Sequence, residues 1–249
     1  MRTARVYIPQ PLSSGAQIVL DETTSHYVVR VLRLRSGQPL VLFNGDGDEY
    51  DARVERAVGT GVVANIGAGR SGNRESPLGI FLGQSVARGE RMDFVLQKSV
   101  ELGVTSITPL RTRRTQVQLS GSRLDNRLAH WGGVVRSACE QSGRTVLPKL
   151  DRVALLSDWL QSAQCRNAQL RLVLDPRASV RLTDLEPAAS VAVLVGPEGG
   201  LTEEEVSEST ARGFVRLRLG PRTLRTETAP LALLAALQTL WGDLSGGSS

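Results

Sequence analysis

The sequence predicts a two-part protein in which a small β-barrel carrying one helix precedes a larger α/β domain with a mainly parallel sheet. Residues 5–66 consist mostly of short apolar runs with the spacing of strands. A glycine-rich polar segment follows at residues 67–72. After Pro77, strand-like and helix-like patterns alternate almost to the end of the chain. These three observations divide the chain into an all-β part and an α/β part.

The first part is expected to be mostly β structure. Apolar and charged residues alternate at residues 50–55, as in a strand with one face in water, and residues 44–47 have the composition of a turn. One helix interrupts the pattern, because residues 21–24 supply capping side chains and apolar residues then recur at helical spacing over 27–32. The expected strands cover residues 6–8, 17–20, 39–43, 50–58 and 61–66.

The segment at residues 67–72 reads GAGRSG and matches the GxGxxG pattern of dinucleotide-binding loops. That motif has to open a helix, whereas here Pro77 follows and favours an extended chain before it. We therefore interpret the segment as a flexible linker. The domain boundary is placed near residue 72, so that the expected domains are 1–72 and 73–249.

The second part is expected to alternate strands with helices. The helix predicted at residues 90–102 has Met92, Val95 and Leu96 on one face, as expected for packing on a sheet. The expected strands cover residues 78–86, 104–110, 170–174, 191–195 and 214–219. The expected helices cover residues 90–102, 123–142 and 153–161, a segment starting at residue 202, and residues 226–240. This order is typical of a mainly parallel sheet.

The composition is that of a globular protein, with 41% apolar and 22% charged residues among 249. No stretch approaches the ~20 apolar residues that a membrane span needs, and the first residues lack the apolar core of a signal peptide. A cytoplasmic protein without a membrane partner is expected. Two cysteines and two histidines form no ligand pattern, so neither a disulfide framework nor a metal site is predicted.

The net charge of +5 is concentrated in the middle of the chain. Residues 73–150 carry twelve basic and six acidic side chains, whereas the segments before and after them are close to balance. Arginine offers a planar fork that suits phosphates and can stack on bases, so a nucleic acid is the natural partner. The arginines that crowd in this region are Arg111, Arg113, Arg114, Arg123, Arg127, Arg136 and Arg144.

Two segments at the ends of apolar strands are the most informative about function. Residues 194–205 read LVGPEGGLTEEE and residues 219–229 read LGPRTLRTETA, while residues 174–177 follow a third strand. Ligands bind beyond the carboxyl ends of the strands in open α/β sheets, and glycines there let a ligand approach the backbone. Taken singly, each loop is an ordinary turn, and Thr202 with Glu205 forms a capping box that starts a helix.

Together, the two segments closely resemble the RsmE-type uridine-N3 methyltransferases of small-subunit (16S) ribosomal RNA, which belong to the SPOUT superfamily. Residues 5–7, 74–77, 97–104 with 107–110, and 138–144 also resemble that family, so the likeness spans nearly the whole chain. It implies a PUA-like N-terminal β-barrel, a SPOUT-type parallel-sheet methyltransferase domain with a deep trefoil knot, and a homodimer. The implied activity is methylation of a uridine N3 with S-adenosyl-L-methionine (SAM) and without a metal.

The same resemblance implies that SAM binds in the loops of the knot. Asp175 stands where the family pattern can have a histidine, which leaves the role of this side chain open. The implied cofactor-binding residues are Leu174, Pro176, Val195, Gly196, Glu198, Gly199, Leu217, Leu219, Gly220, Leu224, Arg225, Thr226 and Thr228.

Transfer of a methyl group to N3 of uridine requires a group that removes the N3 proton. Arg225 could stabilise negative charge on the uracil or hold the SAM carboxylate. Glu227 could accept the proton or anchor the knot, and Glu140 could reach in from a facing subunit. A capping or salt-bridging role for the two glutamates weighs as much as a catalytic one. The catalytic candidates are Arg225, Glu227 and Glu140, and the RNA-binding candidates are Arg111, Arg113, Arg114 and Arg144.

Two further functions are compatible with parts of the sequence. A related SPOUT enzyme would methylate a ribose 2′-hydroxyl, but the N-terminal barrel and residues 139–141 favour the uridine family. A non-catalytic RNA-binding protein would need only the barrel and the arginines. The glycine-rich loops at strand ends argue against that function, because phosphate contacts do not require them.

Overall fold

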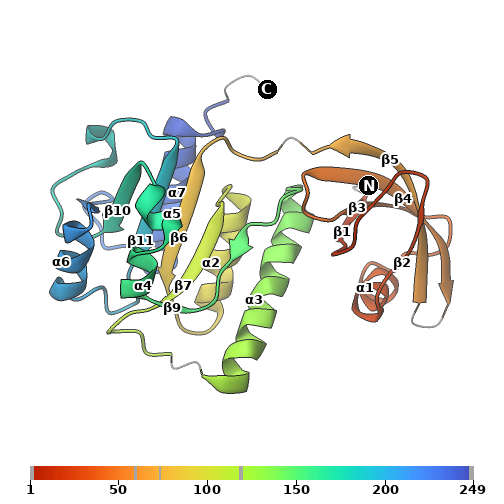
Figure 1. Cartoon of the computed structure of the whole chain (residues 1–249), viewed down its shortest axis with the longest axis horizontal. Helices are drawn as coiled ribbons and strands as arrows, with labels where there is room; N and C mark the ends of the chain where they lie inside the picture. Colours follow the sequence, from red (N-terminus) through yellow and green to blue (C-terminus); the bar gives the residue numbers. More distant parts are fainter. Residues whose placement is uncertain (1–2, 59–60, 73, 118–119, 247–249) are drawn as a thin grey trace. The chain divides into compact units, whose positions relative to one another are not determined.

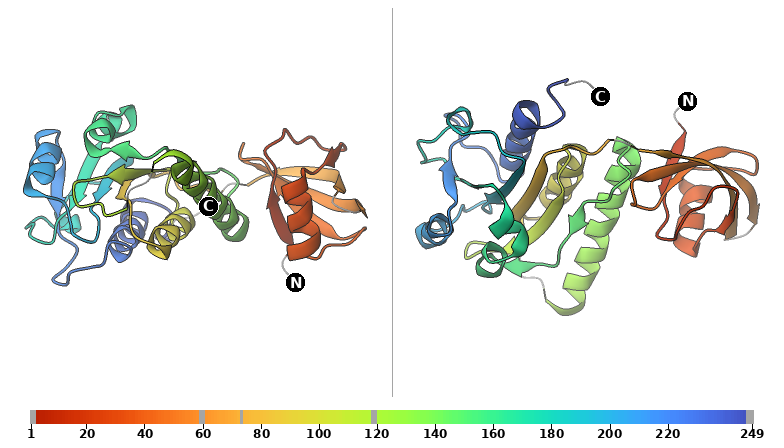
Figure 2. Two further views of the ribbon diagram at one scale, coloured as in Figure 1. Left: turned by 90° about the horizontal axis from the view of Figure 1, so that it is seen from below. Right: turned by 45° about the horizontal axis from the view of Figure 1, so that its top comes forward.

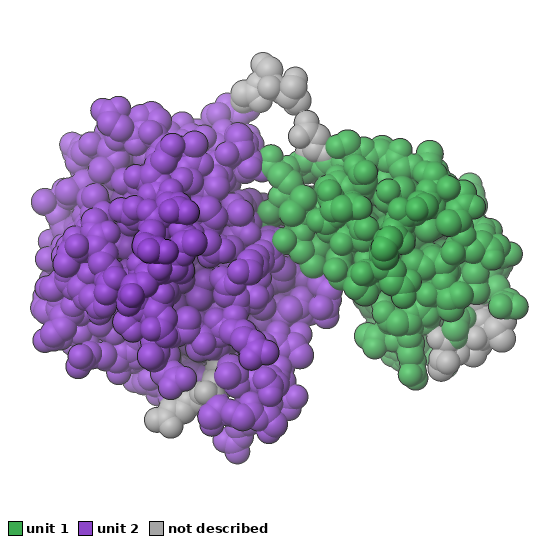
Figure 3. All heavy atoms as spheres, in the orientation of Figure 1, with its two compact units in different colours: residues 1–75, 139–147 green, residues 76–138, 148–249 purple. Residues whose placement is uncertain are grey.

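The computed structural model describes residues 3–58, 61–72, 74–117 and 120–246. The chain forms two compact units (Figure 3). One consists of residues 1–75 and 139–147, and the other of residues 76–138 and 148–249. The division expected near residue 72 differs from these units mainly because it assigned residues 139–147 to the second domain.

The first unit is a five-stranded sheet that packs on one helical segment (Figure 1). Its strands lie in the order β1-β3-β4-β5-β2, with β1 parallel to β3 and the other neighbours antiparallel. Asp21 caps the helix by accepting a hydrogen bond from the Thr24 amide at 2.7 Å, as its sequence predicted. The elements are β1 (Ala4–Tyr7), β2 (Gln17–Val19), α1 (Glu22–His26), a π-helix (Tyr27–Val31), β3 (Pro39–Phe43), β4 (Asp48–Val58) and β5 (Gly61–Ser71).

The prediction of a flexible linker at residues 67–72 was wrong. Residues 67–71 continue β5 and pair with β4, so that Gly69 lies opposite Tyr50. The glycine is required there, because a Cβ at Gly69 would lie 2.7 Å from Cε1 of the Tyr50 ring. The strand partner that orders this glycine-rich segment lies elsewhere in the sequence, and local composition does not reveal it.

Residues 139–147 belong to the first unit because polar contacts hold them there. The Arg144 side chain is only 7% exposed, and its Nη2 lies 2.5 Å from Oε2 of Glu75. The Tyr7 amide donates a hydrogen bond to Oε1 of Glu140 at 3.0 Å. Because the Arg144 guanidinium is buried, losing Glu75 would leave its charge uncompensated, so this ion pair is costly to break.

The second unit is a sheet of parallel strands with helices on both faces. The strand order is β12-β10-β11-β6-β7-β8, and β9 also pairs with β7. Such a sheet places the loops after β10, β11 and β12 at one edge. The strands are β6 (Gly79–Ser85), β7 (Ser106–Arg111), β8 (Lys149–Leu150), β9 (Ala154–Leu155), β10 (Leu170–Leu174), β11 (Ser190–Val195) and β12 (Val215–Leu217).

Helices lie on both faces of this sheet (Figure 2), and an apolar core fills the space on each face. In β11, Val191 and Val193 face the core that α2 and α7 cover, whereas Ala192 and Leu194 face the core of α4 to α6. This alternation follows from the two-residue period of a strand. The helices are α2 (Glu90–Glu101), α3 (Gly121–Ser142), α4 (Leu156–Leu160), α5 (Ala163–Asn167), α6 (Glu203–Ala211) and α7 (Thr228–Trp241), with a 3₁₀ turn at Leu182–Asp184.

Most elements expected in the second unit are confirmed, with small shifts at their ends. The helix expected at residues 153–161 is shorter, because residues 154 and 155 form β9 before α4 begins. The Thr202 and Glu205 capping box is present at the start of α6. No helix within the described part of the chain is long and apolar enough to cross a membrane.

Candidate SAM-binding site

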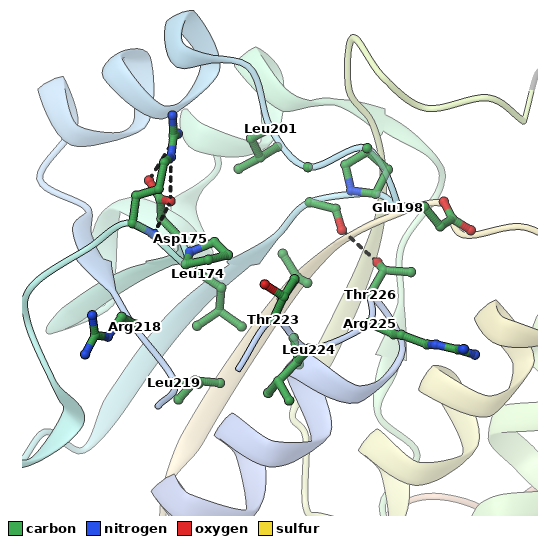
Figure 4. A pocket seen from close by; sticks show the side chains of 18 of the residues that line it. Leu174, Asp175, Glu198, Leu201, Arg218, Leu219, Thr223, Leu224, Arg225 and Thr226 are labelled. Carbon is green, nitrogen blue, oxygen red and sulfur yellow. Dashed lines mark hydrogen bonds and ion pairs between the residues drawn. The ribbon is translucent and has the colours of Figure 1, made fainter. Parts of the chain in front are cut away.

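A cavity of about 690 Å³ lies at the carboxyl ends of β10, β11 and β12 (Figure 4). Its walls combine apolar side chains, backbone of the glycine loops and charged side chains of both signs. Its size lies within the range of sites that hold small molecules or cofactors. Among the expected cofactor-binding residues, those that line it are Leu174, Pro176, Val195, Gly196, Glu198, Gly199, Leu217, Leu219, Gly220, Leu224, Arg225 and Thr226.

The loop after β11 approaches its own backbone closely. A Cβ at Gly196 would lie 2.9 Å from the amide nitrogen of Leu201, so a side chain would push the loop apart. Gly200 has a φ of 69°, in the left-handed region that favours glycine. Arg114 Nη1 donates to the carbonyl of Gly199 at 2.8 Å. These constraints explain why the sequence needs glycines here, beyond an ordinary turn.

Thr226 joins the last loop to the strands beneath it. Its hydroxyl donates to the carbonyl of Gly196 at 2.7 Å (Figure 4). The buried Gln84, at the end of β6, donates to the same hydroxyl at 3.2 Å. The two glycine-containing loops are therefore held together, and the joint occurrence noted in the sequence has a structural basis. Thr228 differs, since it is exposed and does not line the cavity.

Asp175 is a buried carboxylate at the cavity wall. The amide of Arg177 donates to it at 2.9 Å, and Arg216 Nη2 donates at 2.6 Å. Burial by itself raises the pKa of Asp175, but the hydrogen bonds from Arg177 and Arg216 outweigh it and hold the pKa below its ordinary value. Arg177 also forms an ion pair with Glu203. Asp175 thus orders the loop after β10 by binding two arginines.

The catalytic candidates lie in different surroundings. Arg225 and Glu227 both line the cavity, with Arg225 Nη1 4.0 Å from Glu227 Oε1. The Arg225 side chain is 79% exposed and that of Glu227 is 15% exposed. Glu227 makes no capping hydrogen bond to α7, and its Oε2 is buried with no partner among the described residues. The capping alternative for Glu227 is therefore not supported.

Glu140 does not line the cavity. Its carboxylate accepts a hydrogen bond from the Tyr7 amide within the first unit. Burial raises the pKa of the Tyr27 phenol, and the charge of Glu140 and a hydrogen bond with it raise that pKa further. Within one chain Glu140 therefore makes a stabilising contact, and the prediction that it reaches the site of a facing subunit stays a prediction.

The RNA-binding candidates also differ in their exposure and contacts. Arg111 and Arg113 have exposed side chains at the end of β7. The Arg113 amide donates to Oε1 of the buried Glu205 at 2.7 Å, which anchors the backbone while the side chain stays exposed. Arg114 lines the cavity instead. The expectation that Arg144 contacts RNA is not supported, because its guanidinium is buried against Glu75.

Sequence reasoning missed Arg91, in the first turn of α2. Its Nη1 donates to Oε1 of Glu198 at 3.1 Å, and the Arg88 amide donates to the same oxygen at 3.0 Å. Burial raises the pKa of Glu198, but these hydrogen bonds outweigh burial and lower it. The signal that could have found Arg91 is the run of charges opening α2, beside the sheet edge where the loops meet. Among the described residues, no group of three or more His, Cys, Asp or Glu could hold a metal ion.

Comparisons with known proteins agree with this geometry. A family model described as an RNA methyltransferase domain matches residues 74–238, and one described as an RNA methyltransferase PUA domain matches residues 20–65. The chain is 34% identical over 245 residues to the ribosomal RNA small subunit methyltransferase E of Buchnera aphidicola subsp. Schizaphis graminum, covering 98% of this chain and 99% of that relative. The chain belongs to the small subunit methyltransferase E family. The Bacillus subtilis member is 30% identical over 219 residues, 85% of this chain and 86% of that protein.

Two solved structures of similar proteins share the fold of this chain. A ribosomal RNA small subunit methyltransferase E from Neisseria gonorrhoeae bound to S-adenosyl methionine is 40% identical, with a TM-score of 0.90 over 98% of this chain and all of that one. A putative methyltransferase from Legionella pneumophila, in complex with the bound cofactor SAM, is also 40% identical, with a TM-score of 0.94 over the same shares. The first unit therefore contains the PUA domain of the family, and the second contains the methyltransferase domain except for residues 74–75 and 139–147.

Proposed function

We propose that this protein methylates N3 of a uridine in small-subunit ribosomal RNA, with SAM bound in the cavity at the ends of β10, β11 and β12. The single observation that carries the proposal is this cavity, whose lining coincides with the two family motifs. Family membership and the two SAM-bound structural relatives support the cofactor and the RNA substrate class.

The residues of the cavity fit SAM in three respects. Leu174, Leu217 and Leu219 provide an apolar wall of the kind that accepts an adenine ring. The glycine loops offer backbone groups at close range, and Gly196 lets the loop fold tightly against the backbone of Leu201. Carboxylates and guanidinium groups stand nearby for the charged amino-acid portion. Thr228 is the one implied position that we leave out of the site.

The proposed chemistry needs little from the protein beyond alignment and one proton acceptor. SAM, when bound, supplies an electrophilic methyl group. Glu227, which lines the cavity with a side chain that is 15% exposed, accepts the N3 proton as the N3–C bond forms and the bond between the methyl carbon and sulfur breaks. Arg225 lies on the exposed side of the same loop and stabilises the negative charge that develops on the uracil. Neither role requires a metal ion.

The proposal includes three expectations that come from the family resemblance. The last segment, from β12 to α7, is expected to form a deep trefoil knot. Two observations support this: β12 lies at one edge of the sheet, and Thr226, which follows it, donates a hydrogen bond to Gly196 in the loop after β11. The protein acts as a homodimer in the cytoplasm, where ribosomal subunits are modified.

SAM binding is the first test of this function. Calorimetry in EDTA should give a measurable Kd, since no metal is needed, and ribosomal RNA from a deletion strain should lack one N3-methyluridine that the purified protein restores. A folded protein that binds no SAM at millimolar concentration would instead fit the non-catalytic RNA-binding function. A restored methyl group on a ribose 2′-hydroxyl would support the alternative acceptor.

The exposed arginines at the end of β7 should contact RNA phosphates. Replacing Arg111 and Arg113 together by alanine should weaken RNA binding and reduce the slope of log K against log salt by ~0.7–0.9 per lost phosphate contact. The SAM Kd should stay unchanged, because neither side chain lines the cavity. The matched control replaces Arg166 and Arg212, which lie on α5 and at the end of α6. An unaltered salt slope in the first variant would show that its arginines are merely solvated.

A further inference from the structure

Arg91 lines the cavity where two loops meet. Its Nη1 donates to Oε1 of Glu198 at 3.1 Å, and its Nε lies 3.7 Å from Oε1 of Glu227. Glu198 belongs to the loop after β11, and Glu227 immediately precedes α7. One side chain from α2 therefore contacts carboxylates of both loops, although neither loop is adjacent to α2 in the sequence.

The two carboxylates need a cation near them. The Glu198 side chain is 26% exposed and that of Glu227 is 15% exposed, so water screens their charges only in part. Like charges in such a site destabilise each other unless a positive group compensates them. Arg225 is less suited to this role than Arg91, because it is farther from Glu227 and its side chain is mostly in solvent.

The two carboxylates depend on Arg91 to different degrees. Glu198 also accepts a hydrogen bond from the Arg88 amide, so the backbone of the α2 start holds it without any arginine side chain. Within the described part of the chain no backbone amide donates to Glu227, and Arg91, at 3.7 Å, is closer to it than Arg225, at 4.0 Å. Loss of the Arg91 side chain should therefore release Glu227 and the last loop more than the loop of Glu198.

We propose that Arg91 is a positioning residue that holds Glu198 and Glu227 on one guanidinium and so fixes the distance between the two loops. In this arrangement Oε1 of Glu227 faces the arginine, and Oε2 is buried with no hydrogen-bond partner among the described residues. Arg91 acts through the two glutamates and does not itself contact the reacting atoms. The inference rests on the proposed function, because it assigns the two loops to SAM and Glu227 to the proton.

The test compares Arg91→Ala with Arg88→Ala, which removes the same charge three residues away but keeps the backbone donor to Glu198. Calorimetry with SAM should show a Kd about 5- to 20-fold higher for Arg91→Ala, the size expected for one partly exposed charge-assisted contact, and less than twofold higher for Arg88→Ala. Single-turnover methylation at saturating SAM should also be about tenfold slower in Arg91→Ala, and it should be unchanged in Arg88→Ala. Arg91→Lys should recover only part of the lost SAM affinity and methylation rate, because an ammonium lacks the fork that reaches both carboxylates.

Thermal unfolding without SAM supplies a readout that does not depend on the proposed function. The Tm shift of the double variant Arg91→Ala, Glu227→Gln should differ by about 1–3 °C from the sum of the shifts of the two single variants. Additive shifts, or equal effects of Arg91→Ala and Arg88→Ala on SAM binding, would overturn the proposal. If the wild-type protein bound no SAM, the proposed function would fail, whereas the thermal cycle would still decide whether Arg91 holds Glu227.

Discussion

Replacing Glu227 by glutamine should slow methyl transfer by about 100-fold or more, because a positioned base contributes ~10²–10⁴ to a rate and the amide cannot accept the N3 proton as a carboxylate does. The change keeps the shape of the side chain, so SAM binding should change much less than turnover. Single-turnover methylation of small-subunit RNA at saturating SAM measures the chemical step apart from binding and product release.

Glu208→Gln is the matched control for this variant. Glu208 lies on α6 in a surface pair with Arg212, away from the cavity lining, and its loss should leave the rate within about twofold. A near wild-type rate for Glu227→Gln at saturating substrates would remove Glu227 as the proton acceptor. The carboxylate would then serve only to anchor the last loop.

The second large effect is expected at Arg225. Arg225→Ala should lower turnover by at least ~10²-fold, by analogy with the removal of one donor that stabilises a developing oxyanion. The SAM Kd should rise less, because a side chain that is mostly exposed loses little binding energy to a ligand held by the cavity walls. Arg225→Lys should rescue poorly, since a point charge does not reproduce the planar fork.

Calorimetry and single-turnover rates separate the two roles considered for Arg225. A large rise in the SAM Kd with an unchanged saturated rate would mean that this arginine holds the SAM carboxylate. Arg212→Ala provides the charge-matched comparison from the surface of the same unit, and it should change neither quantity.

The sequence allowed the α/β half of the fold to be predicted because its signals are local. Apolar strands, helix caps and turn dipeptides repeat along residues 78–241, and the Thr202 capping box formed as predicted. The edge where the loops meet follows from the rule for parallel sheets. The residues of the two motifs line one cavity for the same reason.

What could not be predicted depends on contacts between distant segments. Arg91 and Gln84 reach the cavity loops because β6 lies beside β11 in the sheet, an order that no local pattern encodes. Conversely, Glu140 sits within a family-like motif, yet its carboxylate binds the Tyr7 amide, over 130 residues earlier in the chain. A motif identifies which residues matter, and the fold decides whether they serve chemistry or packing.

The hydroxyl of Thr226 bonds to Gly196 and Gln84, and Gln238 accepts a hydrogen bond from Ser76 at 2.6 Å. Residues 226–238 thus complete contacts with Ser76 and with Gln84 of β6, both more than 140 positions earlier. A chain from which residues 226–238 are removed leaves the cavity incomplete and the loop after β11 without this contact. We expect such a truncated chain to lose SAM binding and RNA methylation together.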